Sequence, residues 1–123
     1  MDTYLAAAAT ASFITFALHT WVGGPVTAKP LLRSNDMHDV AKYTNYYCWH
    51  LVTITLFVMG GSFAWAAVYP DGIELAWVSL LLSTSFLGWN LFLIVWKSQK
   101  FMQMPQWILF LGISVLGAVG VMG

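Results

Sequence analysis

The sequence predicts an all-α integral membrane protein, a single domain that crosses the bilayer as a four-helix transmembrane bundle. Of its 123 residues, 59% are hydrophobic and only 8% are charged, whereas soluble domains carry about 25% charged residues. So little polar surface cannot cover a water-soluble globule, and a large core does not explain the deficit in so short a chain. We therefore expect lipid to surround most of the protein.

Four apolar segments predict the helices. We expect them at about 4–22, 43–68, 73–96 and 105–122. Segments of this length cross a hydrocarbon core of about 30 Å at about 1.5 Å of rise per residue. Backbone groups cannot remain unpaired in lipid, so each segment must be helical. Each connection contains glycine, proline or charged residues that end a span.

The first connection, 23–42, is stiffer than a flexible linker because it contains two prolines. Ser34 or Asn35 is a candidate N-cap for the sequence DMHDVAKY. Apolar and small residues recur there at helical spacing: Met37, Val40, Ala41 and Thr44. We therefore expect an amphipathic turn or two on the membrane surface, ahead of the second span.

The basic residues predict the orientation of the helices. All of them lie in the first and third connections: Lys29, Arg33, Lys42, Lys97 and Lys100. The positive-inside rule places these connections in the cytoplasm and both termini outside. Asp2, Asp71 and Glu74 then lie on the outer face, and tryptophan and tyrosine residues near the span ends form the interfacial belts.

The stretch YTNYYCWHL places polar and aromatic side chains where the second span leaves the cytoplasmic headgroups. His50 lies a turn or two inside this span. His19 lies four residues before Gly23, about 6 Å inside the first span. Because neighbouring spans run antiparallel, the two imidazoles reach the same depth and could face each other across a cavity. This pair is the only arrangement in the sequence that suggests chemistry.

Two cofactors match such a site. A pair of imidazoles on separate helices, here His19 and His50, is the ligand set of a six-coordinate b-type haem. A quinone is the other candidate, because a histidine can hydrogen-bond its carbonyl while Trp49, Tyr46 or Tyr47 stacks on its ring. A zinc site is weaker, since Cys48 points about 200° away from His50 around the helix.

The histidines also have structural interpretations. Each imidazole can be a polar tip at the interface, satisfied by a backbone carbonyl, by water, or by Thr15 or Thr53 one turn away. Hydrogen-bonded to each other, His19 and His50 would fix the first helix against the second.

Polar and small residues within the spans predict close helix packing. We expect Asn90 to be hydrogen-bonded across helices, which contributes around 1 kcal/mol. Small residues let helix backbones approach closely, inside the bundle or against another subunit. The expected packing positions are Gly60, Gly61, Gly112, Ser114 and Gly117.

Several function classes are disfavoured. No charged residue lies in the middle of a span, which counts against a proton- or cation-coupled transporter. Hydrolytic motifs, such as a serine nucleophile elbow or paired zinc-binding histidines on one helix, are absent. A net charge of zero argues against a nucleic-acid partner.

Three sequence motifs, PLLRS, YYCWHLVT and MPQWILFLG, follow the first-helix histidine. In this combination the chain resembles small four-helix inner-membrane proteins of bacteria, a group with no established activity. The resemblance covers most of the chain and implies a multi-pass protein of the bacterial inner membrane. It rests on His19, Gly24, Pro30, Leu31, Leu32, Tyr47, Trp49, His50, Pro105, Gln106 and Trp107.

Two functional hypotheses follow. The leading one is a non-catalytic accessory, assembly or scaffold subunit, which packs its small-residue faces against a larger membrane complex or against its own copies. The alternative is a membrane redox protein that binds b-type haem or quinone between His19 and His50.

Overall fold

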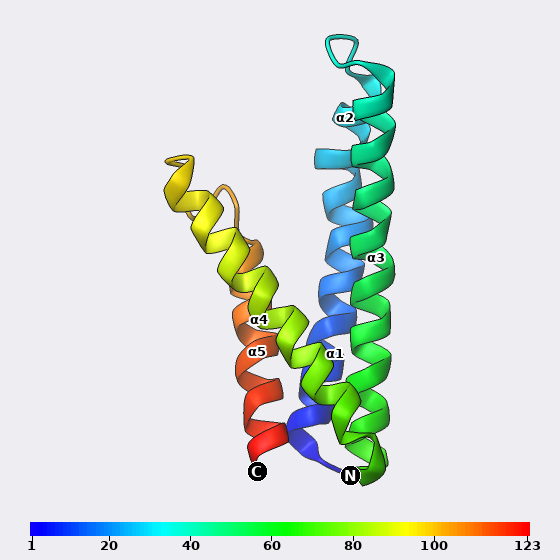
Figure 1. Ribbon diagram of the computed structural model, residues 1–123, viewed down its shortest axis with the longest axis vertical. Coiled ribbons are helices and arrows are strands. Elements are labelled where there is room, and N and C mark those ends of the chain that lie inside the picture. The colour runs from blue at the N-terminus through cyan, green and yellow to red at the C-terminus, as the bar shows by residue number, and fades with distance from the viewer.

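The computed structural model describes all residues from 1 to 123 and contains helices but no strands, which confirms the predicted all-α class (Figure 1). Four long helical stretches follow one another. The first is composite, with α1 (Thr3–Ala17), the π-helix η1 (Leu18–Ala28) and α2 (Lys29–Arg33) in direct succession. The others are α3 (Asp39–Val68), α4 (Ile73–Trp96) and α5 (Gln106–Met122), and the 3₁₀ turn η2 (Pro70–Gly72) joins α3 to α4.

Three of the four stretches are long and apolar enough to cross a membrane: Thr3–Arg33, Asp39–Val68 and Pro70–Trp96. The fourth, Gln106–Met122, is apolar but has only 17 residues. At about 1.5 Å per residue, the first two stretches are about 45 Å long, more than a hydrocarbon core of about 30 Å requires.

The sequence predicts that the first helix ends at Gly23, Gly24 and Pro25. The helix does not end there, because this segment continues as the π-helix η1. Proline lacks an N–H and its ring clashes with the carbonyl four residues earlier in an α-helix. A π-helix bonds residues five apart, as Lys29 N–H does to Gly24 O, so its wider turns accommodate Pro25. The connection shrinks from 23–42 to residues 34–38.

The start of the second long helix also differs from the prediction. Helix α3 begins at Asp39, and its N-cap is His38 in place of Ser34 or Asn35. The Nδ1 of His38 accepts a hydrogen bond from Val40 N at 3.3 Å. The expected surface turns ahead of the span are therefore the first turns of α3 itself.

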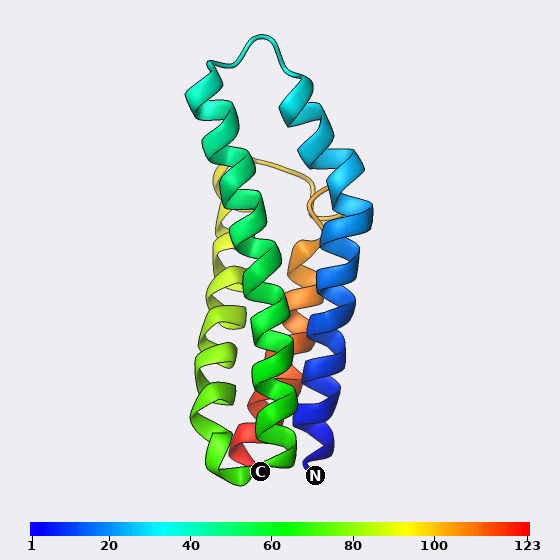
Figure 2. The ribbon, with the colours of Figure 1, turned by 90° about the vertical axis from the view of Figure 1, so that its right-hand side faces the viewer.

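The helices form two pairs that meet at one end and separate toward the other (Figure 1). One pair is α1 with α3, and the other is α4 with α5; α1 also packs along α5. Both termini lie at the end where the pairs meet, which we call the closed end (Figures 1 and 2). The other, the open end, carries the connection 34–38 and the turn after α4.

The buried core fills the closed end. It includes Leu5 and Ala8 of α1, Phe63 of α3 and Ile113 of α5, all at most 2% exposed. Asp2 closes the start of α1: its side chain accepts from Leu5 N at 2.8 Å, and its own N–H donates to Ala67 O at 2.7 Å. The second bond ties the N-terminus to the end of α3.

The small residues expected at helix contacts fall into two groups. Gly60 lies against the Phe13 ring, Gly117 lies against the Phe63 ring, and Ser114 is hydrogen-bonded to Ser83 across the interface of α5 with α4. Gly61 and Gly112 are exposed, and a Cβ added at either would have no neighbour within 4 Å. Only the first group packs within this chain.

Candidate functional site

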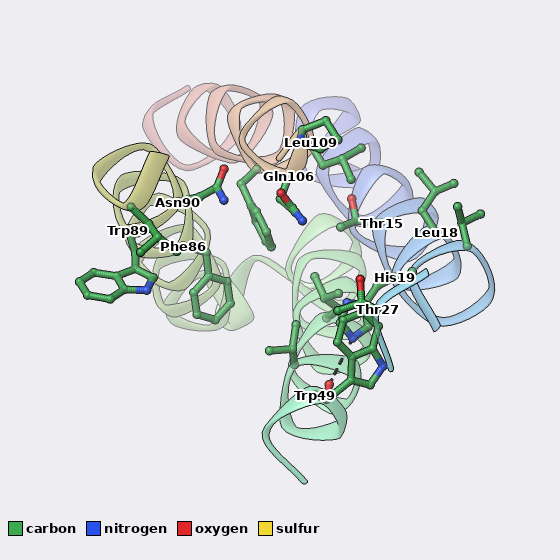
Figure 3. Close-up of a pocket in the computed structure, with 17 residues that line it drawn as sticks. Thr15, Leu18, His19, Thr27, Trp49, Phe86, Trp89, Asn90, Gln106 and Leu109 are labelled. Carbon is green, nitrogen blue, oxygen red and sulfur yellow. Dashed lines mark hydrogen bonds between the residues drawn. The ribbon is translucent and has the colours of Figure 1, made fainter. Parts of the chain in front are cut away.

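A cavity of about 430 Å³ lies between the two helix pairs, above the closed end (Figure 3). Its 17 lining residues come from α1 and η1, from α3, from α4, and from Pro105 and the first turns of α5. All four long helices therefore contribute to one site. No aspartate, glutamate, lysine or arginine is among these residues.

The π-helix η1 places His19 on one wall of the cavity. The His19 Nε2 lies 3.2 Å from the backbone oxygen of Trp49 on α3. The imidazole also stacks on the Trp49 indole, with ring centroids 3.9 Å apart and planes inclined by 19°. Gly23 lets η1 approach the same indole, because a Cβ there would lie 3.0 Å from the ring. His19 and Trp49 thus form a fixed aromatic wall.

The hydrogen bond to Trp49 sets the tautomer of neutral His19. A backbone carbonyl can only accept, so Nε2 must carry the proton, which leaves Nδ1 as an acceptor. Nδ1 has no hydrogen-bond partner within the chain, and it is not among the fully buried unpaired atoms. It is therefore open to a donor from outside the chain.

Asn90 of α4 brings an amide group to the cavity. Its Oδ1 is buried and has no hydrogen-bond partner, and no other buried side-chain nitrogen or oxygen of the chain lacks one. The interhelical hydrogen bond expected for Asn90 is absent because α4 diverges from α1 and α3 at this level (Figure 1). Figure 3 shows Asn90 and Gln106 pointing into the space between the pairs.

Aromatic side chains form the wall opposite His19. Phe86 on α4 meets Phe110 on α5 edge to face, with centroids 5.3 Å apart. Trp89 lines the cavity beside them (Figure 3). Such walls suit a planar apolar ring better than a polar metabolite. No group of three histidine, cysteine, aspartate or glutamate residues is placed to hold a metal ion.

The structure does not bring His19 and His50 into one cavity. His50 is exposed and lines a second cavity of about 320 Å³ with Tyr46 and Lys29, between η1, α2 and α3. The Tyr46 ring meets the imidazole of His50 edge-on, with centroids 4.7 Å apart. Trp49 lines both cavities, and each histidine lines only one of them.

Tyr47 was also expected to contact a ligand, but its side chain is 63% exposed and lines neither cavity. The sequence did not single out Phe86, Trp89 or Gln106 as site residues. The sequence did contain one signal for this site, a pair of amide side chains. Asn90 lies near the end of one apolar span and Gln106 at the start of the next, so both lie on the same side of the bundle. Helical spacing could not show that these two spans diverge together from the other two at this end.

The comparisons with known proteins identify no relative: no protein-family model, no curated protein and no solved structure matches the chain.

Proposed function

We propose that the chain is a multi-pass protein of the bacterial inner membrane, with both termini on the outer side. Large apolar side chains are exposed along all four long helices, among them Ile54, Leu81 and Val115, and such a surface favours lipid over water. The five basic residues lie toward the end opposite the termini, which supports the orientation by the positive-inside rule.

Within that membrane, the proposed function is to bind a membrane-soluble, mainly apolar ligand in the cavity, without a catalytic step. The observation that carries this proposal is one cavity of about 430 Å³ that all four helices line. Ligand sites have volumes of about 300–1,000 Å³, with apolar walls and a few polar groups that fix orientation. The separation of the two pairs would let such a ligand enter sideways from the lipid.

The redox alternative changes in form. A haem held by both histidines has little support, since His19 Nε2 is bonded to Trp49 O and His50 lines the other cavity. A quinone or quinol still belongs to the proposed ligand class, now between His19 and Asn90 in place of His19 and His50.

Ligand binding is tested by filling the cavity with a larger side chain. Val52 of α3 lines it, whereas Val58 on the same helix is 56% exposed and lines neither cavity. Protein purified in mild detergent is extracted with organic solvent, and the extract is analysed by mass spectrometry. An apolar compound that co-purifies with wild type and with Val58→Trp, but not with Val52→Trp, supports the proposal. Equal amounts in all three proteins would contradict it.

The accessory, assembly or scaffold subunit remains a second proposal. Gly61 on α3 and Gly112 on α5 are exposed with open space around them, and exposed glycines of this kind suit a close helix contact with a partner or a second copy. Light scattering of the protein in mild detergent tests it. A strictly monomeric particle, with nothing co-purifying, would argue against this role.

A further inference from the structure

We propose that the second cavity, between η1, α2 and α3, binds the phosphate headgroup of an anionic phospholipid. The inference rests on the membrane placement proposed above, but it concerns a different cavity from the one assigned to the apolar ligand. It follows from three polar side chains that line the second cavity, those of Lys29, Tyr46 and His50.

A positive charge without a counter-charge is the first observation. Lys29 lines the second cavity, and no aspartate or glutamate does. The chain contains one salt bridge, between Lys42 and Asp39, so the Lys29 ammonium group is paired with no carboxylate. An ammonium group carries three donors and no acceptor. The cavity therefore offers a cation to a bound anion, and no carboxylate in its lining repels that anion.

Tyr46 and His50 of α3 extend the set of donors. They lie one helical turn apart, and their rings meet edge to face with centroids 4.7 Å apart. A phenol carries one O–H, and a neutral imidazole carries one N–H. Lys29 lies on α2, so donors reach the cavity from both of its walls. A phosphate group suits this arrangement, because its several oxygens accept hydrogen bonds from different directions.

The second cavity lies toward the open end of the bundle. Figure 2 shows η1 and α2 diverging from α3 toward the connection 34–38, and the cavity lies between these helices. The proposed orientation puts the open end at the cytoplasmic surface, where the basic residues gather. Basic pockets between transmembrane helices on that side bind anionic lipid headgroups.

Apolar side chains favour a lipid over a free anion. Trp21 and Leu32 line the second cavity, and both are exposed at the outer surface of the helices. The cavity is therefore continuous with a surface that lipid covers. The glycerol and the first acyl carbons of a phospholipid gain from contact with these side chains. A free phosphate ion has no apolar part to place there.

The experiment measures the binding of single lipids to the protein by native mass spectrometry in a mild detergent. The two lipid probes, dioleoyl phosphatidylglycerol and dioleoyl phosphatidylcholine, share their acyl chains and differ in headgroup charge. Phosphatidylglycerol should bind about fivefold more tightly, because the choline cation opposes the attraction of the phosphate to Lys29. Inorganic phosphate is added as a competitor and should not displace the lipid.

The matched variants are Lys29→Gln and Lys100→Gln. Lys100 carries the same charge at the same end of the bundle but lines neither cavity. Lys29→Gln should weaken the binding of phosphatidylglycerol about fivefold. It should leave phosphatidylcholine binding unchanged, which also shows that the cavity is intact. Lys100→Gln should change neither.

Three outcomes would overturn the inference. Equal binding of the two lipids to wild type would remove the preference for an anionic headgroup. Equal losses in Lys29→Gln and Lys100→Gln would indicate a diffuse attraction to the basic end. Displacement of phosphatidylglycerol by inorganic phosphate would assign the cavity to a free anion.

The apolar-ligand proposal is decided separately. Val52 lines the cavity of about 430 Å³ and not the second cavity, so Val52→Trp should leave phosphatidylglycerol binding unchanged. Loss of the extracted apolar compound in Val52→Trp therefore tests one proposal, and the lipid preference of Lys29→Gln tests the other.

Discussion

The closed and open ends of the protein are built from the same four helices but differ in side-chain size where the helices face one another. At the closed end the facing residues include Ala8, Ala67, Ala76, Gly117 and Gly120, all buried. Residues of this size let helix backbones come together, and van der Waals packing then holds them in lipid.

At the open end, bulky side chains take their place. Trp49, Phe86, Trp89 and Phe110 line the cavity, and only Phe110 among them is fully buried. These rings line the space between the helix pairs without filling it. The closed end therefore holds the packed core and the open end holds the cavity, so substitutions at the two ends should have different consequences.

The largest effect is expected from deleting core atoms at the closed end. Leu5→Ala should lower the free energy of unfolding by about 2–5 kcal/mol, because Leu5 is 2% exposed and its removal leaves a cavity. Leu81→Ala, at a 66% exposed position, should cost less than about 0.5 kcal/mol. Reversible unfolding in mixed micelles, followed by circular dichroism, measures both. Similar losses would show that the closed end is not the stable core.

A smaller loss of stability is expected when a methyl group is added at Gly120, which faces Leu5. A Cβ at Gly120 would lie 2.6 Å from Leu5 Cδ2 and 3.0 Å from Leu5 N, so Gly120→Ala should cost about 1–3 kcal/mol. Gly112→Ala, with nothing within 4 Å, is the control and should be neutral or slightly stabilising.

The contact between Leu5 and Gly120 can also be tested with a double variant. Leu5→Ala removes the side chain that the Gly120→Ala methyl group would meet. The double variant should therefore lose less stability than the sum of the two single losses. Strict additivity in the same unfolding assay would contradict the close approach of α1 and α5.

The smallest effect on stability is expected at the open end. Gly23→Ala places a methyl group 3.0 Å from the Trp49 ring, whereas a Cβ at Gly24 has no neighbour within 4 Å. Because Trp49 borders cavities, its ring can shift, and Gly23→Ala should cost about 1 kcal/mol or less.

The informative readout for this pair is spectroscopic. Gly23→Ala should alter the near-ultraviolet circular dichroism of the stacked indole and weaken ligand binding, and Gly24→Ala should do neither. An unchanged spectrum for both would show that Gly23 does not position the wall of His19 and Trp49.

Hydropathy and composition were enough to predict the all-α class and the approximate helix positions. The spans expected at 73–96 and 105–122 agree closely with α4 and α5, since the charged and proline-containing segments beside them end an apolar run. The first connection was predicted poorly, because glycine and proline normally break an α-helix but are accommodated in the π-helix η1.

The site was only partly predictable. His19 and Trp49 were identified from their depth and chemistry, and the structure places both on one wall. The structure places His50 in the lining of the other cavity, because equal depth does not specify the direction of a side chain around a helix.

The sequence by itself determined the helices and the end at which the basic residues gather, because hydrophobicity and charge act along the chain at short range. Only the tertiary structure decided that the helix pairs diverge, and that Asn90 and Gln106 line one cavity with His19. The reason is that the separation of the helix pairs depends on the side chains of four helices together, and these cannot be judged from one segment alone.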